Sequence, residues 1–237
     1  MANRLGTLPR KLVVFTGAGM SAESGVDTFR TPGGIWQRYA VEDVATPEAW
    51  ARDPDRVTDF YNMRRRQLVE EAMPHAGHRL IAQLEEHTEV RVVTQNVDDL
   101  HERAGSSHVL HLHGELRRVR STGPDATSYP WEGWEVRPTD RCPAGYRLRP
   151  DVVWFGEEVP NWPVALHALQ DADALLVVGT SLRVYPAAGL LEAMPASAHI
   201  TLVDPDEIPL QRGVHLQATA SEGLAELWKA WLPGMPL

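Results

Sequence analysis

Cysteine is almost absent from this chain, which has one cysteine, Cys142, among its 237 residues. A lone thiol cannot form an intramolecular disulfide, and it cannot supply a zinc site built on four cysteines. The sequence also lacks an apolar run of about 18 residues, the length that a membrane-spanning helix needs, and its start shows no signal-peptide pattern. We therefore expect a cytoplasmic protein without a membrane partner.

Basic residues are scarce as well. The chain has 23 lysines and arginines against 32 aspartates and glutamates, which gives a formal net charge of −9. This balance argues against a protein that binds nucleic acid through a general basic surface. Hydrophobic residues make up 43% of the chain, which is ordinary globular usage and predicts a packed core. Nothing in the sequence indicates the oligomeric state.

Short aliphatic runs alternate with helical patterns along the chain. Runs rich in β-branched residues predict buried parallel strands at 11–16, 90–94, 174–178 and 200–203. Apolar residues at helical spacing predict helices at 56–73 and 76–86, and a C-terminal helix that packs Trp228 and Trp231 on the sheet. The strands end in small or polar residues, as they do where loops reach a ligand.

This alternation predicts an α/β fold, a Rossmann-type doubly wound parallel sheet made of residues 8–30, 76–114 and 151–237. Two stretches do not fit it. Residues 31–75 predict a helical insertion, and residues 115–150 are rich in Arg, Pro, Gly and Trp without periodicity. We expect these two stretches to form a smaller inserted lobe, with the site in the cleft between the lobes.

A glycine-rich turn, Gly17-Ala18-Gly19, follows the first predicted strand. Glycines let a backbone approach an anion closely, and a following helix offers free N–H groups. However, the next glycine falls at Gly25, so the spacing is not that of the usual dinucleotide fingerprint. On this evidence a phosphate cradle and a plain tight corner explain the turn equally well.

Further segments resemble, in order and separation, the motifs of the sirtuin family, over about residues 10–232. They are 24–30 (Ser-Gly-Val-Asp-Thr-Phe-Arg), 94–101 (Thr-Gln-Asn-Val-Asp-Asp-Leu-His), 112–114 (Leu-His-Gly), 152–157 (Val-Val-Trp-Phe-Gly-Glu) and 179–187 (Gly-Thr-Ser-Leu-Arg-Val-Tyr-Pro-Ala). Segment 152–157 and the Arg-Arg-Arg-Gln run at 64–67 are similar to the class III, desuccinylase-like branch.

The resemblance implies an NAD-dependent deacylase of protein lysines, which consumes NAD as a co-substrate and releases nicotinamide and O-acyl-ADP-ribose. Its partners would be acyl-lysine proteins. The residues implied to bind NAD are Gly17, Ala18, Gly19 and Ser21 around the phosphates; Phe29 and Arg30 over the nicotinamide ribose; Gln95, Asn96 and Asp98 at the ribose and carboxamide; Gly179, Thr180 and Ser181 in the phosphate cradle; and Asp204 and Ala220 at the adenosine.

His113 is the implied general base, because the reaction needs a group that activates a ribose hydroxyl. An imidazole suits this task since its ordinary pKa, about 6.5, lies near the working pH. For His78, His101 and His111 we expect a structural role instead: His78 and His101 hydrogen-bond in the core or cap a helix.

Tyr61 and Arg64 indicate the substrate. They are three residues apart on a predicted helix, so both can face one pocket, where a guanidinium and a hydroxyl suit a carboxylate. The class III resemblance implies a pocket for succinyl-, malonyl- or glutaryl-lysine, with Ala45 leaving room. From spacing alone a solvated arginine beside a core tyrosine is the simpler interpretation. The substrate backbone would pair with an extended edge formed by Val152, Val153, Trp154, Phe155 and Gly156.

The chain departs from the family pattern at three places. The small lobe lacks the two cysteine pairs that usually hold zinc, so we predict no zinc and no other metal; an apolar cluster of Tyr129, Trp131, Trp134 and Tyr146 could replace it. Asp27 stands where proline is usual, in the cofactor loop. Asp204 replaces an asparagine, and a carboxylate accepts hydrogen bonds but cannot donate them.

Two other functions are compatible with the sequence. An NAD glycohydrolase or ADP-ribosyltransferase would share the cofactor chemistry but use another acceptor. A non-catalytic NAD-binding module would have lost its substrate together with its zinc. Tyr61 and Arg64 argue against the first alternative, and His113 argues against the second.

Overall fold

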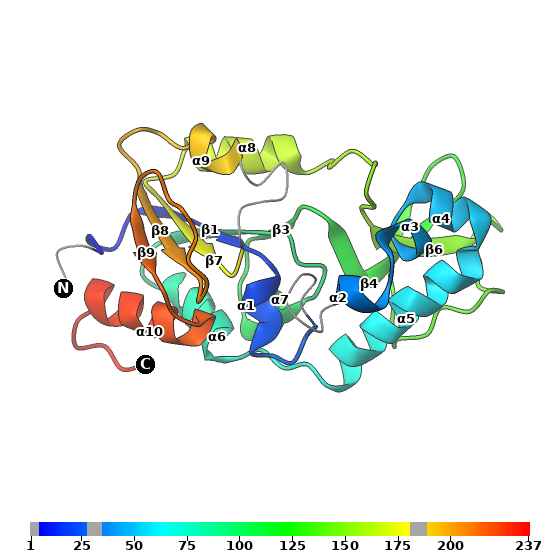
Figure 1. Cartoon of the computed structure of the whole chain (residues 1–237), viewed down its shortest axis with the longest axis horizontal. Coiled ribbons are helices and arrows are strands. Elements are labelled where there is room, and N and C mark those ends of the chain that lie inside the picture. Colours follow the sequence, from blue (N-terminus) through cyan, green and yellow to red (C-terminus); the bar gives the residue numbers. More distant parts are fainter. Residues whose placement is uncertain (1–4, 28–34, 181–188) are drawn as a thin grey trace.

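The computed structural model describes residues 5–27, 35–180 and 189–237, and its core is a six-stranded parallel sheet (Figure 1). The strand order is β3-β2-β1-β7-β8-β9. The strands are β1 (Lys11–Thr16), β2 (Glu89–Thr94), β3 (Val109–His111), β7 (Ala174–Val178), β8 (His199–Val203) and β9 (Val214–Leu216). The predicted doubly wound α/β fold and its four strands are confirmed, and β3 and β9 are additional edge strands.

Strand β1 lies at the centre of this sheet, between β2 and β7. Thr16, at its end, is in register with Thr94 on one side and Val178 on the other. The chain therefore leaves β1 at the point where the strand order reverses, and open α/β sheets bind ligands in the crevice at this point. The first glycine turn lies in that crevice because it follows Thr16 directly.

Helices cover both faces of the sheet. On one face α1 (Ala18–Ala22), α6 (Ala76–Leu84) and α10 (Ala220–Trp231) share a core with the strands, and on the other lie α8 (Trp162–Gln170) and α9 (Leu190–Ala193) (Figure 1). The short helix α7 (Leu100–Ala104) contacts α6. Trp228 and Trp231 are buried in the first of these cores, which confirms the predicted packing of the C-terminal helix. No helix among the described residues is long and apolar enough to cross a membrane.

The predicted helical insertion contains α2 (Ile35–Arg38), α3 (Val41–Val44), α4 (Pro47–Arg52) and α5 (Pro54–Glu70). Residues 115–150, which showed no periodicity, form most of an antiparallel sheet of order β5-β4-β6. Its strands are β4 (Gly114–Ser121), β5 (Ser128–Pro130) and β6 (Leu148–Val152). The pattern was hidden because the pairing of β4 with β6 shifts register between Gly114 and Val119, so inward positions do not alternate.

One apolar core joins the helical insertion to this small sheet. It contains Ile35 and Phe60 from the helices together with Leu116, Val152 and Trp154. Both predicted parts of the small lobe therefore contribute to the same core, although the division of the chain into two domains stays a prediction.

Arg65 of α5 fastens the helix to the small sheet. Its side chain is fully buried, and it donates to the carbonyls of Leu116 at 2.5 Å and Trp134 at 2.9 Å, and to the side-chain oxygen of Asn62 at 2.9 Å. Asn62 in turn exchanges two hydrogen bonds with the backbone of Val136. Burial lowers the pKa of Arg65 to about 10, so the guanidinium stays charged at neutral pH. This arginine is therefore a structural link and not part of a solvated basic run.

Gly114 begins β4 directly after His113, and it needs to be glycine for two reasons. Its φ is +78°, and a Cβ there would lie 2.1 Å from the carbonyl oxygen of Asp151. Gly133 has a similar φ of +71°, but a Cβ there would meet no atom within 4 Å. A substitution at Gly133 therefore isolates the backbone strain alone.

We expect Gly114→Ala to lower the free energy of unfolding by about 2–4 kcal/mol, because it adds an overlap to the strain. Gly133→Ala should lower the free energy of unfolding by only about 1–2 kcal/mol, the strain of the left-handed backbone. Urea unfolding of both variants at an unchanged m-value measures the difference. Equal losses would show that Asp151 does not restrict this position.

Candidate active site

Three glycines bring two strand ends into contact at the crevice. Gly17 donates its N–H to Val178 O at 3.1 Å, and Gly19 donates to Gly179 O at 2.8 Å. Gly179 has a φ of +63°, and a Cβ on it would lie 2.1 Å from the backbone nitrogen of Met20. A side chain at any of these positions would push β1 and β7 apart at their ends. The N–H of Gly19 already donates to Gly179 O, so it is not the group that would bind a phosphate. Gly19 would help a phosphate to bind because it has no side chain and leaves space.

A buried polar network connects this turn to the loop after β2. The side-chain amide of Asn96 donates to Gly17 O and to Ser21 Oγ, both at 3.0 Å, and Ser21 Oγ donates to Asp98 Oδ2 at 2.8 Å. All three side chains are buried. Burial raises the pKa of Asp98, although the Ser21 hydroxyl and the Leu100 amide oppose the rise. The network fixes the orientation of the carboxamide and the carboxylate at the ends of β1 and β2.

A second layer below this network consists of hydroxyls and imidazoles. Thr16 Oγ1 lies 2.8 Å from Thr94 Oγ1 and 3.0 Å from His101 Nε2, and Thr94 Oγ1 accepts the N–H of Asn96 at 3.0 Å. His101 packs edge-on against His78, which is fully buried and whose ring nitrogens have no hydrogen-bond partner among the described residues. Burial lowers the pKa of His101 to about 4 and that of His78 to about 2, so both are neutral. The predicted core hydrogen bond holds for His101 but not for His78.

His113 faces the same loop from the end of β3. Its Nδ1 lies 3.1 Å from Gln95 O, an atom that can only accept, so Nδ1 carries the proton and Nε2 carries the lone pair. Burial lowers the pKa of His113, although the Gln95 carbonyl opposes this. The imidazole is therefore neutral near pH 7, the state that a general base requires.

His111, two residues earlier, contacts the next carbonyl of the loop but has a different charge. Its Nδ1 lies 2.9 Å from Asn96 O and its Nε2 lies 2.7 Å from Glu102 Oε1. Both partners are acceptors, so only the imidazolium satisfies both. Burial opposes this charge, yet the Glu102 carboxylate outweighs it and the pKa of His111 is raised. Sequence reasoning assigned His111 no specific role, although histidines at alternate positions of one strand end were a signal for it.

Tyr61 and Arg64 lie on the same side of α5 and are both buried, with about 6% of each residue exposed. Tyr61 accepts a hydrogen bond from the indole Nε1 of Trp154 at 3.1 Å. Burial raises the pKa of Tyr61 to about 12 and lowers that of Arg64. The interpretation of Arg64 as a solvated arginine is wrong, because the residue is buried. Ala45 lies beside this group, since its carbonyl accepts the N–H of Phe155 at 3.0 Å.

The predicted extended edge at 152–156 ends in a turn at residues 155–156, and its pairing with a substrate backbone stays a prediction. Strand β6 ends at Val152, and residues 155–156 form a turn in which Gly156 has a φ of +90°. The N–H of Val153 donates to His113 O at 2.9 Å, and Trp154 is buried. Phe155 is 47% exposed. The stretch therefore turns instead of continuing the sheet, because Glu157 Oε2 accepts the Trp154 N–H at 2.7 Å and draws the chain back.

The remaining predicted cofactor residues fall into two groups. Thr180 is buried beside Gly17, and Asp204 and Ala220 are buried at the end of β8 and the start of α10. Burial raises the pKa of Asp204, although the Asp206 amide opposes the rise. Phe29, Arg30 and Ser181 lie outside the described residues. Asp27 is described, and it forms an ion pair with Arg38 of α2.

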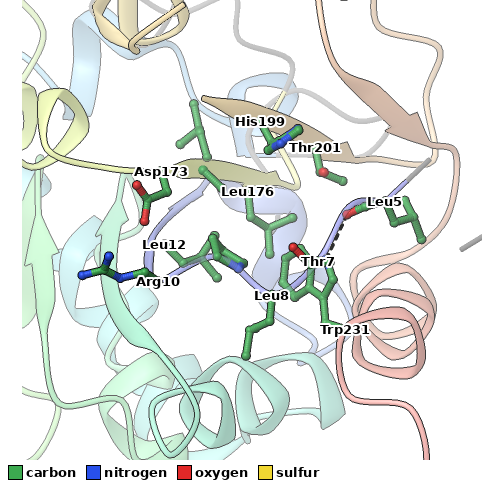
Figure 2. Close-up of a pocket in the computed structure, with 13 residues that line it drawn as sticks. Leu5, Thr7, Leu8, Arg10, Leu12, Asp173, Leu176, His199, Thr201 and Trp231 are labelled. Atoms are coloured by element: carbon green, nitrogen blue, oxygen red, sulfur yellow. Dashed lines mark hydrogen bonds between the residues drawn. The ribbon is translucent and has the colours of Figure 1, made fainter. Parts of the chain in front are cut away.

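A separate cavity lies at the opposite end of the sheet, and none of the candidate site residues lines it. It has a volume of about 290 Å³ and lies at the amino ends of β1, β7 and β8 (Figure 2). Leu5, Leu12, Leu176 and Trp231 line it, and Trp231 Nε1 donates to Leu5 O at 2.9 Å. The candidate active site is therefore defined by the strand ends and the buried network.

These features fit a pyrophosphate-containing dinucleotide. The glycines leave room beside the ends of β1 and β7, and the buried carboxamide, hydroxyl and carboxylate offer both donors and acceptors. The Sir2 family model, moreover, matches residues 17–186. The chain belongs to the Sir2 family.

The similarity to individual Sir2 proteins extends over nearly the whole chain. The chain is 50% identical over 232 residues to an NAD-dependent protein deacylase of Bacteroides thetaiotaomicron, covering 94% of this chain and 99% of the relative. It is 44% identical to another from Mycolicibacterium paratuberculosis, covering 92% and 96%. A solved Sir2 homologue in complex with NAD superimposes with a TM-score of 0.87 at 41% identity, covering 96% of this chain and 92% of that one.

The described residues do not fit the zinc that Sir2 proteins usually carry in the small lobe. Among the described residues no group of three His, Cys, Asp or Glu side chains could hold a metal ion. Cys142 instead lies in an apolar cluster with Val119, Val136 and Leu148, and its Sγ accepts the Ser121 hydroxyl at 3.3 Å. Tyr129 and Trp131 pack on this cluster as predicted, whereas Tyr146 lies over Gly123 and Trp134 lies under Arg66.

We expect the purified Sir2 protein to contain no stoichiometric zinc and to keep its melting temperature in a strong chelator, because the apolar cluster and Arg65 hold the lobe. Metal analysis together with a thermal scan measures both. Cys142→Ala should cost only about 1 kcal/mol, as for a small buried side chain. A melting temperature that falls by more than about 5 °C on chelation would contradict this account.

The opposite pKa shifts of His113 and His111 predict a pH profile with two limbs. As the pH rises, the deacylation rate should first increase when His113 loses its proton, at a pH below the ordinary histidine pKa. It should then decrease when His111 loses its proton, at a pH above the ordinary histidine pKa. The ion pair of His111 with Glu102 stabilises the fold below the unfolded pKa, and this stabilisation is lost as the pH rises through the raised pKa of His111. Asp98, His101 and Glu115 also act on His111, and they are unchanged in the test.

We expect Glu102→Gln to move the alkaline limb to lower pH and to reduce kcat/KM at pH 8 by roughly threefold, while the acidic limb stays in place. Glu85→Gln is the matched control, because Glu85 binds Ser107 and no histidine. Steady-state rates between pH 5.5 and 9.5 measure both limbs. An unchanged alkaline limb in Glu102→Gln would rule out the charged state of His111.

Proposed function

We propose that this chain is an NAD-dependent protein-lysine deacylase that prefers acyl groups ending in a carboxylate, such as succinyl, malonyl or glutaryl. The observation that carries the deacylase part is the convergence of His113 with the Asn96–Ser21–Asp98 network at the strand switch point. Relatives at 43–50% identity that carry the name NAD-dependent protein deacylase support the same activity.

Bound NAD would supply a ribose whose nicotinamide can leave and whose hydroxyls can be deprotonated. Gly17, Gly19 and Gly179 would leave space for its phosphates, and Asn96 and Asp98 would hold its ribose and carboxamide. His113 would take a hydroxyl proton on Nε2, because Nδ1 is committed to Gln95 O. The charge formed on the ring would be held by that carbonyl, whose hydrogen bond favours the protonated form.

The preference for acidic acyl groups rests on Tyr61 and Arg64. A buried guanidinium beside a buried hydroxyl is a poor environment for an uncharged acetyl group, and it suits a carboxylate that shares both donors. Asp27 and Asp98 also act on Arg64 and keep its charge. Ala45 is a small side chain in the same core as Tyr61 and Trp154, and its size would leave room for a longer acyl chain.

An NAD glycohydrolase or ADP-ribosyltransferase is the alternative, and one assay separates it from the deacylase. The enzyme is supplied with NAD and with acetyl-, succinyl- or unmodified lysine peptides, and nicotinamide and acyl-ADP-ribose are followed. Nicotinamide release that depends on acylated peptide, with acyl-ADP-ribose in equal amount, supports the deacylase. Release without peptide would favour the alternative.

We expect Arg64→Met to lower kcat/KM for a succinyl peptide by about 30-fold or more, since a charge-assisted hydrogen bond to the carboxylate is lost. For an acetyl peptide the change should stay within about threefold. Arg66→Met is the matched control, because Arg66 is in the same run but pairs with Glu70 at the surface. An unchanged ratio of the two substrates in Arg64→Met would refute the pocket while leaving the deacylase activity intact.

A further inference from the structure

We infer that Trp154 determines acyl specificity through Tyr61: its indole N–H occupies the acceptor side of the Tyr61 hydroxyl and leaves the hydroxyl proton to be donated to the carboxylate of the acyl-lysine. This inference rests on the proposed preference for acidic acyl groups and adds a residue that acts without touching the carboxylate. Trp154 is a positioning residue in this account, and Tyr61 is the residue that binds.

The direction of the hydrogen bond follows from the chemistry of its partners. An indole nitrogen carries one proton and has no lone pair to accept with, so at 3.1 Å Trp154 Nε1 donates and Tyr61 Oη accepts. The raised pKa of Tyr61, about 12, keeps the phenol protonated at neutral pH. The hydroxyl proton therefore points away from the indole, and the phenol is held as a donor on its other side.

The indole can fix the direction of the Tyr61 hydroxyl proton because its own position is fixed by packing and by ion-pair contacts. Trp154 is 2% exposed, its ring lies 5.7 Å from that of Trp50, and the Arg149 guanidinium lies 3.3 Å from its centroid. Arg149 also donates to both carboxylate oxygens of Glu157, at 2.7 and 3.1 Å, and Glu157 accepts the backbone N–H of Trp154. The same carboxylate therefore fixes the backbone of Trp154 and the cation that covers its ring.

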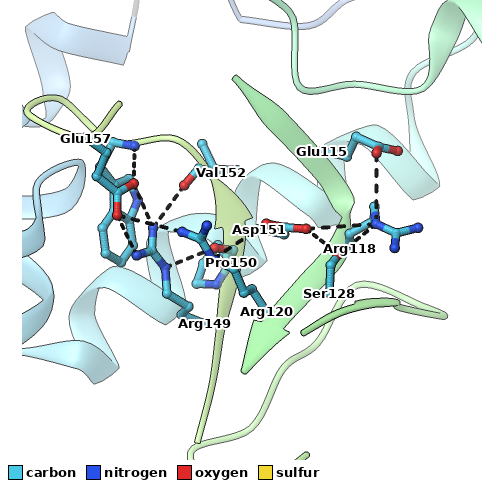
Figure 3. Close-up of polar contacts among 10 residues, drawn as sticks. Glu115, Arg118, Arg120, Ser128, Arg149, Pro150, Asp151, Val152 and Glu157 are labelled. Carbon is cyan, nitrogen blue, oxygen red and sulfur yellow. Dashed lines mark hydrogen bonds and ion pairs between the residues drawn. The ribbon is translucent and has the colours of Figure 1, made fainter. Parts of the chain in front are cut away.

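The Arg149–Glu157 ion pair is part of a wider ion network between β4 and β6 (Figure 3). Arg120 lies 3.7 Å from both Glu157 and Asp151, and Arg118 lies 3.9 Å from Asp151. Burial lowers the pKa of Arg149, but its hydrogen bonds to Glu157 oppose this and help to keep it charged. The network anchors the turn after β6 to the small sheet, so the indole cannot follow Tyr61 if the phenol rotates.

A phenol that lacks this donor has a choice of orientations and can present either its proton or a lone pair. A succinyl carboxylate needs the proton and is repelled by a lone pair, whereas an acetyl group has no atom at this position. Loss of the indole N–H should therefore affect succinyl-lysine and spare acetyl-lysine, which a loss of packing would not do.

The test measures kcat/KM for succinyl and acetyl peptides at saturating NAD in wild type, Trp154→Phe, Tyr61→Phe and the double variant. Phenylalanine keeps a ring under Arg149 but has no N–H. We expect Trp154→Phe to lower the succinyl-to-acetyl ratio by about three- to tenfold, the effect of a misdirected hydrogen bond. In the Tyr61→Phe background the same change should leave the ratio within about twofold, because the two residues act as a unit.

Trp50→Phe is the matched control, since Trp50 packs in the same core and is not bonded to Tyr61. Equal losses for both substrates in Trp154→Phe, or the same fall of the ratio with and without Tyr61, would overturn the inference. If Arg64→Met leaves the ratio unchanged, the acyl pocket itself fails and the inference fails with it. A ratio that responds to Arg64 and Tyr61 but not to Trp154 overturns the inference alone.

A measurement without a Trp154 variant guards against a folding defect. In protein labelled with ¹⁵N-tryptophan, the indole resonance that changes in Tyr61→Phe reports this hydrogen bond. Addition of a succinyl-lysine peptide without NAD, so that no turnover occurs, should shift this resonance, because a phenol that donates to a carboxylate becomes a better acceptor. An acetyl-lysine peptide should shift it less. Equal responses to the two peptides would contradict the inference.

Discussion

The contact between two backbones at the ends of β1 and β7 is the constraint on which the candidate site depends. Gly19 donates to Gly179 at 2.8 Å, and a Cβ on Gly179 would lie 2.1 Å from Met20 N, so neither backbone has room for a side chain. This contact sets the start of α1, and hence the position of Ser21. Ser21 in turn links Asn96 to Asp98. Because these backbone positions must be glycine, the polar side chains at the ends of the neighbouring strands have a fixed arrangement.

Two imidazoles hold consecutive carbonyls of the loop after β2, and their surroundings give them opposite charges. His113 is half-buried and faces Gln95 O, and desolvation lowers its pKa. His111 faces Asn96 O and also Glu102, and its pKa rises. The same residue type is therefore neutral at position 113 and charged at position 111. One acidic side chain on α7 makes the difference.

Much of the fold could be predicted because long buried strands and amphipathic helices have clear periods, as residues 11–16 and 174–178 show. The small sheet could not, since the register shift in β4 removes the alternation on which such predictions depend. Motif residues such as Asn96 and Asp98 do come together at one strand edge. The contact of Glu102 with His111 could not be predicted, because it depends on the turn of α7 that brings the two side chains together. The predicted extended edge at 152–156 is interrupted by a turn at 155–156, where Glu157 accepts the Trp154 N–H.

Helix α5 explains why a run of arginines could not be interpreted from charge alone. Residues three apart share a side, so Tyr61 and Arg64 lie on one side of the helix while Asn62 and Arg65 face β4 and the loop at 134–136. Arg65 is tolerated in the interior because backbone carbonyls accept its protons, and such acceptors leave no mark in the sequence. Arg66, one position further, reaches solvent and pairs with Glu70. The same helix thus fixes the lobe with one side and carries the proposed specificity residues on the other, so a change that displaces Arg65 would move Tyr61 and Arg64 as well.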